Sequence, residues 1–120
     1  CIEAWILKGA EVVFCTGGMS VDAVDLTPSA IKELASEIVF QGVPALPGSN
    51  LMLAKKDDVL ILGVPACAVH ADITVLDTLM HRLYAGLIPT NDEVRRWGVG
   101  GLCRGCSPCN YPTCAFGCRG

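Results

Sequence analysis

The sequence predicts an α/β domain, a three-layer sandwich on a mostly parallel sheet, followed by a short cysteine-rich tail. Three observations support this. The apolar, β-branched runs at 12–15 and 59–63 have the composition of strands buried on both faces. Segments with helical spacing of apolar residues alternate with these strands, a pattern typical of parallel α/β folds. Beyond residue 98 the composition changes abruptly to Gly, Cys and Pro. We therefore expect an α/β domain at residues 1–97 and a tail at residues 98–120.

Local signals place the individual elements. Gly9 is expected to stop the first helix, and Thr27 to cap the second, with Pro28 in its first turn. Thr90 and Glu93 have the spacing of a capping box for the last helix. The predicted elements, in chain order, are a helix at 1–8, a strand at 12–15, a helix from 27, a strand at 37–41, a loop at 42–50, a charged turn at 55–58, a strand at 59–63, a long helix at 69–85 and a short helix ending at 97.

The charge of the chain is unevenly distributed. The net charge is −3, but residues 1–94 carry 12 acidic and 5 basic side chains, whereas residues 95–120 carry 4 arginines and no acid. An acidic body argues against a nucleic-acid partner. The longest apolar run, 59–69, is too short and too interrupted to span a membrane. With no signal-peptide pattern, we expect a cytoplasmic protein; because residue 1 is not Met, we interpret the chain as part of a longer one.

Glycines and polar side chains follow the first predicted strand directly, in the run Thr16-Gly17-Gly18-Met19-Ser20-Val21-Asp22-Ala23-Val24-Asp25. Open α/β folds bind ligands at the carboxyl ends of their strands. Glycine there allows a ligand to approach the main chain closely. The run therefore predicts a small-molecule site. The alternative is a turn that only ends the strand, with Asp25 helping to cap the next helix.

This run and two later motifs resemble the molybdopterin-binding domain family, which includes molybdopterin adenylyltransferase, the molybdenum-insertion enzyme, gephyrin-like fusions and the competence-damage protein domain. Leu46-Pro47-Gly48 is similar to the family's Pro-Gly turn, and Leu62-Gly63-Val64-Pro65 to its turn before a long helix. Order and spacing agree over residues 11–86. The sequence departs from the family at Asp22, where the molybdenum-insertion branch usually has glycine, and at Ala66-Cys67. The strand-helix-strand segment that opens the family domain would precede Cys1.

The resemblance implies binding of molybdopterin, the dithiolene pterin phosphate of molybdenum and tungsten enzymes. The glycine turn would offer N–H and hydroxyl donors, and its two aspartates would accept from pterin N–H groups or hold Mg²⁺ if a nucleotide is handled. The Pro-Gly turn would border the same cleft. The residues implied in binding are Thr16, Gly17, Gly18, Ser20, Asp22, Asp25, Pro47, Gly48 and Ser49.

The resemblance also implies a homo-oligomer acting in molybdenum cofactor biosynthesis or delivery, with a molybdenum or tungsten enzyme as recipient. It assigns no catalytic residue and no enzymatic step to this chain. A nucleotide-processing enzyme, like the competence-damage relatives, is an alternative. It is weakened because the sequence offers no catalytic constellation beyond Asp22 and Asp25.

The tail holds five cysteines with the spacing C-x2-C-x2-C-x4-C-x3-C. They are Cys103, Cys106, Cys109, Cys114 and Cys118. The first three have a spacing typical of iron–sulfur clusters, with Cys114 as the fourth ligand and Cys118 in reserve. Two close pairs would equally form a four-thiolate zinc site, whereas disulfides are disfavoured in a cytosolic chain. Without metal, we expect the tail to be disordered.

These cysteines support a second function, that of an iron–sulfur or zinc-binding redox or regulatory protein with the α/β body as its scaffold. Cys15 is expected to be a core residue of the first strand. Cys67 is expected at a helix start, where the helix dipole would lower the pKa of its thiol.

Overall fold

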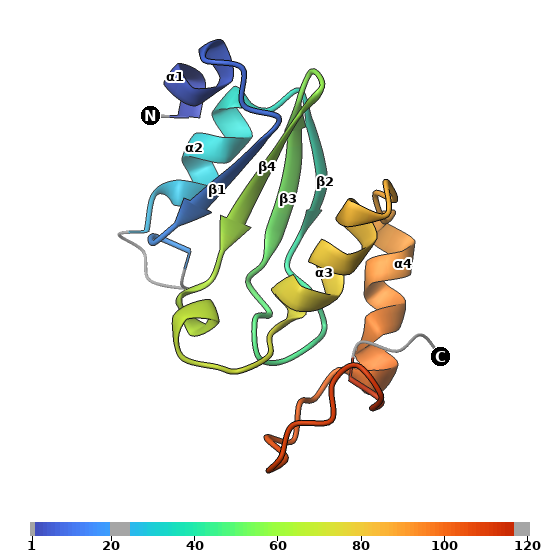
Figure 1. Cartoon of the computed structure of the whole chain (residues 1–120). Helices are drawn as coiled ribbons and strands as arrows, with labels where there is room; N and C mark the ends of the chain where they lie inside the picture. Colours follow the sequence, from blue (N-terminus) through green and yellow to red (C-terminus); the bar gives the residue numbers. More distant parts are fainter. Residues whose placement is uncertain (1, 20–24, 117–120) are drawn as a thin grey trace.

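A four-stranded sheet forms the centre of the computed structural model, which describes residues 2–19 and 25–116. Its strand order is β1-β4-β3-β2, from β1 (Val12–Thr16), β2 (Glu37–Gln41), β3 (Met52–Lys56) and β4 (Val59–Val64) (Figure 1). β1 and β4 pair in parallel, but β3 pairs antiparallel with both β4 and β2. The predicted α/β class is confirmed, and the prediction of a mostly parallel sheet is wrong.

The parallel prediction fails because the sequence analysis missed β3. The predicted charged turn at 55–58 is shorter in the structure: Lys55 and Lys56 end β3, and only Asp57 and Asp58 join it to β4. Asp57 has a positive φ of 53°, as tight hairpin turns require. A two-residue connection can join only antiparallel strands. β3 is therefore the hairpin partner of β4.

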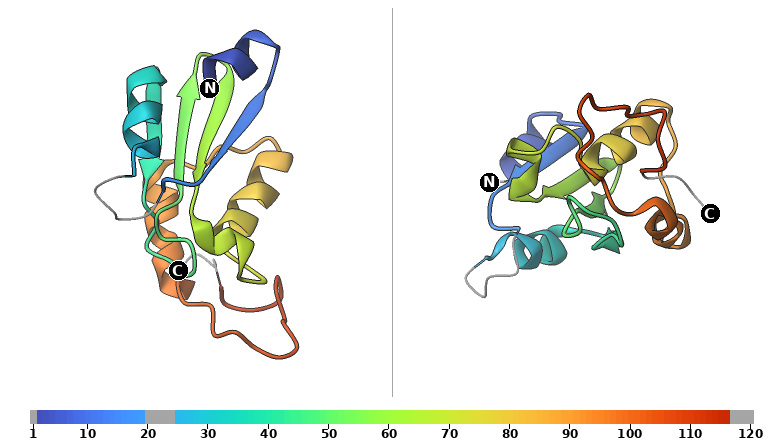
Figure 2. Two further views of the ribbon diagram at one scale, coloured as in Figure 1. Left: turned by 90° about the vertical axis from the view of Figure 1, so that its left-hand side faces the viewer. Right: turned by 90° about the horizontal axis from the view of Figure 1, so that it is seen from below.

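Helices lie on both faces of this sheet. The helices are α1 (Ile2–Leu7), α2 (Thr27–Leu34), α3 (Val75–Tyr84) and α4 (Asn91–Arg96), with short 3-10 helices η1 (Ala66–Val69) and η2 (Trp97–Gly100). Figure 2 shows α2 and α3 on opposite sides of the strands. The smaller core, beneath α2, consists of Met19, Ile31, Met52, Ala54 and Ile61. The larger core lies beneath α3 and α4 and consists of Phe40, Val43, Ala45, Leu51, Leu53, Leu62, Val64, Val75, Leu79, Val94 and Trp97.

α3 begins later than the predicted helix at 69–85. Thr74 caps it: its hydroxyl oxygen accepts from the Leu76 amide, and its own amide donates to the Asp77 carboxylate at 2.8 Å. Residues 66–69 form η1 instead, after Pro65. The capping box of Thr90 and Glu93 is confirmed at the start of α4.

Trp97 ties the end of the domain to the larger core. Its side chain is fully buried, and the guanidinium of Arg82 lies 4.7 Å from the centroid of its ring. After η2 the chain runs beside the β2–β3 loop, where Leu46 and Leu102 form a parallel bridge. In the described part of the chain, no helix has the length and apolar character needed to cross a membrane.

Candidate functional site

Three sequence motifs meet at one edge of the sheet (Figure 1). β1 and β4 end together, with Thr16 opposite Val64. β2 ends and β3 begins at this same edge, because Met52 pairs with both Gln41 and Gly63. The glycine turn after β1, the loop between β2 and β3, and η1 after β4 are therefore neighbours. This is the edge at which α/β sheets place their ligands.

The glycine turn has a backbone that side chains would disturb. Gly17 and Gly18 have φ values of +84° and +68°, in the left-handed region that glycine tolerates. A Cβ on Gly18 would lie 2.4 Å from the Thr27 hydroxyl oxygen, whereas a Cβ on Gly17 would meet no atom of residues 2–19 or 25–116 within 4 Å. Close packing against Thr27 thus requires a glycine at position 18, and no such contact with the described residues restricts Gly17.

Thr27 holds this turn in place rather than capping α2. The residue at the N-cap is Leu26, which makes no side-chain capping bond, so the predicted cap is wrong. The Thr27 hydroxyl instead donates a hydrogen bond of 2.8 Å to the carbonyl oxygen of Gly17. The first residue of α2 therefore fixes the position of the turn that follows β1.

Met19 is a residue of this turn that sequence reasoning did not single out. Its side chain is 3% exposed and belongs to the core beneath α2. A Cβ on Gly63 would lie 2.5 Å from the Met19 methyl carbon, so Met19 covers the end of β4. The family-like motif at 62–65 and the glycine turn are thereby packed directly against each other.

The predicted Pro-Gly turn is docked on the start of α3. The Val75 amide donates to the Pro47 carbonyl oxygen at 3.0 Å. Gly48 has a φ of +112°, and a Cβ there would lie 2.7 Å from a Val75 methyl carbon. The Ser49 carbonyl accepts from the Val43 amide at 2.8 Å, which closes the loop on itself. Pro47 and Ser49 stay partly exposed at the edge of the sheet.

The structure describes only some of the other predicted site residues. Ser20, Asp22 and Cys118 lie outside the described residues. Asp25 is half-buried and precedes α2. Within residues 2–19 and 25–116, no three His, Cys, Asp or Glu side chains are close enough, as they stand, to hold a metal ion. The four described tail cysteines nevertheless line a single cavity, as shown below.

The two isolated cysteines differ in environment. Cys15 packs against the core beneath α2, and burial raises the pKa of its thiol, which favours the protonated form. This agrees with the expected core role. Cys67 is half-buried inside η1, a 3-10 helix of four residues, and not at the start of the long helix as predicted.

Two comparisons with known proteins identify the family. A family model described as a probable molybdopterin binding domain matches residues 2–85, which include the whole sheet, η1 and α3. The chain belongs to the molybdopterin-binding domain family. This confirms the resemblance seen in the sequence.

A similar curated protein is the molybdopterin molybdenumtransferase of Bacillus subtilis (strain 168). It is 28% identical to this molybdopterin-binding domain over 98 residues, which cover 72% of this chain and 23% of the relative. The chain thus spans less than a quarter of that relative's length. α4, η2 and the cysteine tail lie beyond the residues that the family model matches.

Proposed function

We propose that this domain binds molybdopterin at the edge of the sheet formed by the glycine turn and the β2–β3 loop, and serves as a binding module in molybdenum cofactor biosynthesis or delivery. The observation that carries the proposal is the position of the glycine turn, which follows β1 at the edge where β1 and β4 end and β3 begins. Thr27 fixes this turn, and the family match covers every element that meets at this edge.

The chemistry of the residues at this edge suits a pterin that carries a phosphate. The Thr16 hydroxyl and the backbone N–H groups of Gly17 and Gly18 would donate to phosphate oxygens, since successive N–H groups in a turn form an anion-binding concavity. Ser20 would add a hydroxyl. Asp25 would accept from the N–H groups of the pterin ring. This division of donors and acceptors would fix the orientation of the ligand.

The remaining predicted residues complete the proposed cleft. Pro47, Gly48 and Ser49 would border it from the β2–β3 loop. Asp22 would accept from the pterin beside Asp25, and both would hold Mg²⁺ if a nucleotide is handled. Because the chain spans 23% of the molybdenumtransferase it matches, metal insertion is not part of the proposal. A homo-oligomer and a recipient molybdenum or tungsten enzyme remain part of it.

A fluorescence titration with molybdopterin tests the proposal through two matched glycine variants. Gly17 and Gly86 both have positive φ, +84° and +77°, and a Cβ on either would meet no atom of the described residues within 4 Å. Gly17→Ala and Gly86→Ala therefore impose a similar backbone strain, of about 1 to 2 kcal/mol. Only Gly17 lies at the proposed site, so we expect at least a tenfold weaker affinity for Gly17→Ala and an unchanged affinity for Gly86→Ala.

Two results would overturn the proposal. One is the absence of saturable molybdopterin binding by the unaltered protein. The other is equal affinity of the two glycine variants, which would place the ligand away from the turn. Asp25→Asn, which keeps the shape of the side chain, should weaken binding if that carboxylate accepts from the pterin. Far-UV circular dichroism of each variant shows that the comparison is made on folded protein.

A further inference from the structure

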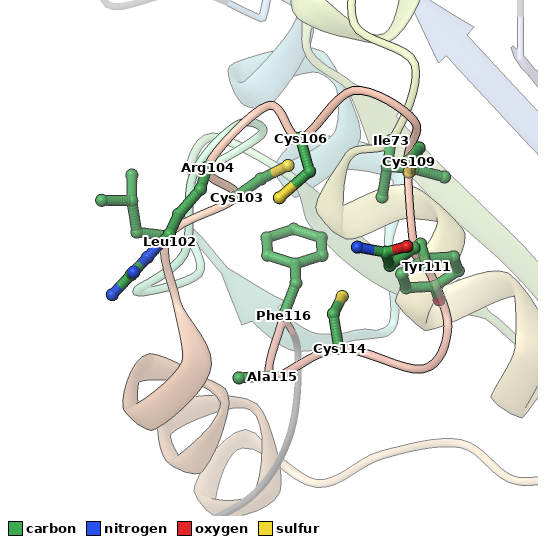
Figure 3. Close-up of a pocket in the computed structure, with 11 residues that line it drawn as sticks. Ile73, Leu102, Cys103, Arg104, Cys106, Cys109, Tyr111, Cys114, Ala115 and Phe116 are labelled. Carbon is green, nitrogen blue, oxygen red and sulfur yellow. The ribbon is translucent and has the colours of Figure 1, made fainter.

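Four cysteines outside the proposed pterin site line one cavity in the tail. The cavity has a volume of about 100 Å³, and Cys103, Cys106, Cys109 and Cys114 all contribute to its wall. Figure 3 shows the sulfur atoms of Cys103, Cys106 and Cys114 directed toward the space around the Phe116 ring, with Cys109 toward Ile73. Residues up to 11 positions apart in a segment without regular secondary structure are thus brought to one place.

The tail is anchored to the body at two points. The Cys103 amide donates to the Leu46 carbonyl oxygen at 2.8 Å. The Tyr111 hydroxyl lies 3.1 Å from Nδ1 of His81, and the two rings stack with centroids 5.6 Å apart. Phe116 is buried, with 7% exposure, and its ring lies edge-on to that of Tyr111, with centroids 6.3 Å apart. The beginning and the centre of the described tail are therefore held against the domain.

Between these anchors the tail has little to stabilise it. Residues 104–110 are exposed, and the backbone hydrogen bond described between residues 103 and 116 joins Thr113 to Asn110. Folded proteins contain about one internal hydrogen bond per residue. Two of the side chains by which this segment lines the cavity are the thiols of Cys106 and Cys109. A bound group that engages thiols would supply the stabilisation that the backbone lacks.

We propose that Cys103, Cys106, Cys109 and Cys114 hold a thiolate-ligated metal centre, either zinc or an iron–sulfur cluster. A Cys₄ zinc site and a four-iron cluster each take four thiolate ligands, and the tail provides four cysteines around one cavity. In the arrangement described, the thiols are not yet close enough for coordination. Because metal binding is coupled to folding, the exposed segment 104–110 tightens around the metal while the anchors stay in place.

The charge of the tail favours this centre. Four thiolates around Zn²⁺ leave a net charge of −2, and coordination releases the thiol protons to solvent. Arg104 contributes to the wall of the cavity, and residues 95–120 carry 4 arginines and no acidic side chain. This basic segment partly neutralises the thiolate charge. Acidic side chains in the tail would instead repel the negatively charged thiolates.

The metal centre would lie next to the proposed pterin site without depending on it. A second cavity, of about 300 Å³, is lined by Cys103, Cys106 and Cys109 from the tail and by Pro47 and Asp72 from the body. The tail cysteines thus face the β2–β3 loop. Metal binding and pterin binding are measured separately, so either proposal can fail while the other stands.

The test is metal loading of the whole chain in two separate arms. In the first arm, reduced protein is titrated with Zn²⁺ against a coloured chelator. In the second, anaerobic protein is incubated with ferrous iron and sulfide, desalted, and examined for bound iron, acid-labile sulfide and the visible absorption of a cluster. We expect one zinc ion or one cluster per chain in at least one arm. Cys67→Ser is the matched control, because Cys67 lies in the body.

The variants decide the outcome. Cys106→Ser and Cys109→Ser should each lower the affinity at least tenfold, whereas Cys67→Ser should leave it unchanged. Loading of the triple variant Cys103→Ser/Cys106→Ser/Cys109→Ser equal to that of the unaltered protein would overturn the proposal. So would the absence of metal in both arms. Circular dichroism confirms that the body of each variant is folded.

Amide hydrogen exchange gives a second readout that does not use a cysteine variant. Metal should slow the exchange of the Cys103 amide, which donates to Leu46, and of the Thr113 amide, which donates to Asn110. Exchange in β3 and β4 should not change, because these strands lie in the body. Unchanged exchange throughout the tail after metal addition would contradict the proposed folding around the metal.

Discussion

The hydroxyl of Thr27 donates a hydrogen bond of 2.8 Å to the carbonyl oxygen of Gly17. This bond joins the first residue of α2 to the turn that follows β1, across a separation of ten residues. The next glycine, Gly18, packs against the same hydroxyl so closely that a Cβ there would overlap it. One side chain therefore positions both glycines of the proposed pterin site.

Thr27→Val should loosen the glycine turn while keeping the shape of the side chain. Loss of one partly exposed hydrogen bond should lower the free energy of unfolding by about 1 kcal/mol. Molybdopterin affinity should fall more than this alone explains, because Gly17 would no longer be held in place. Chemical denaturation and the fluorescence titration measure the two effects.

Thr27→Ser is the control for this change, because it keeps the hydroxyl and removes only a methyl group. Affinity close to that of the unaltered protein is expected for it. If Thr27→Val and Thr27→Ser bound molybdopterin equally well, the hydrogen bond to Gly17 would have no part in forming the site.

Trp97 should be essential for stability although it lies beyond the family match at residues 2–85. Its side chain is fully buried in the larger core, so Trp97→Ala should lower the free energy of unfolding by about 3 to 5 kcal/mol. The matched control is Trp5→Ala, because Trp5 is 57% exposed and its replacement should cost less than about 1 kcal/mol. Denaturant unfolding curves measure both variants.

Two shortened chains test where the domain ends. A chain that stops at residue 90 lacks Val94 and Trp97, two residues of the larger core, and should not unfold cooperatively. A chain that stops at residue 102 keeps both and should retain the cooperative transition. Cooperative unfolding of the shorter chain would contradict a domain that extends to residue 97.

Local signals predicted the parts of the fold that local interactions determine. The spacing of Thr90 and Glu93 predicted a capping box, and the structure shows both of its hydrogen bonds. Thr74 and Asp77 have the same spacing and form the same motif at α3, a signal that was present but not used. The predicted helix began at residue 69, among the residues before Thr74, whereas α3 begins at Val75.

Tertiary interactions explain the remaining differences between the predicted fold and the observed fold. Thr27 stands before Pro28 as an N-cap residue would. Its hydroxyl instead donates a hydrogen bond to the carbonyl oxygen of Gly17, which is ten residues away in sequence. β3 ends in two lysines, which suggested a turn, and only its pairing with β4 makes it a strand: Ala54 lies opposite Ile61. Similarly, the sequence around Met19 does not show that its side chain packs against Gly63 in β4.

The turns of the proposed site were easier to recognise in the sequence than the sheet around them, and their part in binding stays a prediction. Glycine turns and Pro-Gly turns have recognisable sequences, and both lie at the edge of the sheet where the resemblance implied a cleft. What the sequence could not provide was the difference between Gly17 and Gly18. That difference depends on Thr27, which a Cβ at position 18 would overlap, whereas a Cβ at position 17 would meet no atom of the described residues within 4 Å.

The docked tail should respond to alkaline pH through Tyr111. Burial raises the pKa of its hydroxyl above the ordinary value of 10.0. An acid whose pKa is raised in the folded state stabilises that state at pH values below its unfolded pKa. This contribution is lost as pH rises through the folded pKa. Contact between Tyr111 and His81 should therefore persist at neutral pH and weaken above pH 10.

A titration of tyrosinate absorbance in the Tyr84→Phe variant measures this pKa directly. The chain has two tyrosines, so this variant leaves Tyr111 as the sole source of the signal. The midpoint should lie above that of the same variant unfolded in urea, because unfolding returns the hydroxyl to water. His81→Ala removes the ring that stacks on Tyr111 and should bring the native midpoint closer to the unfolded one. Coincident midpoints in native and unfolded protein would show that Tyr111 is not buried against α3, and that the tail is not docked as described.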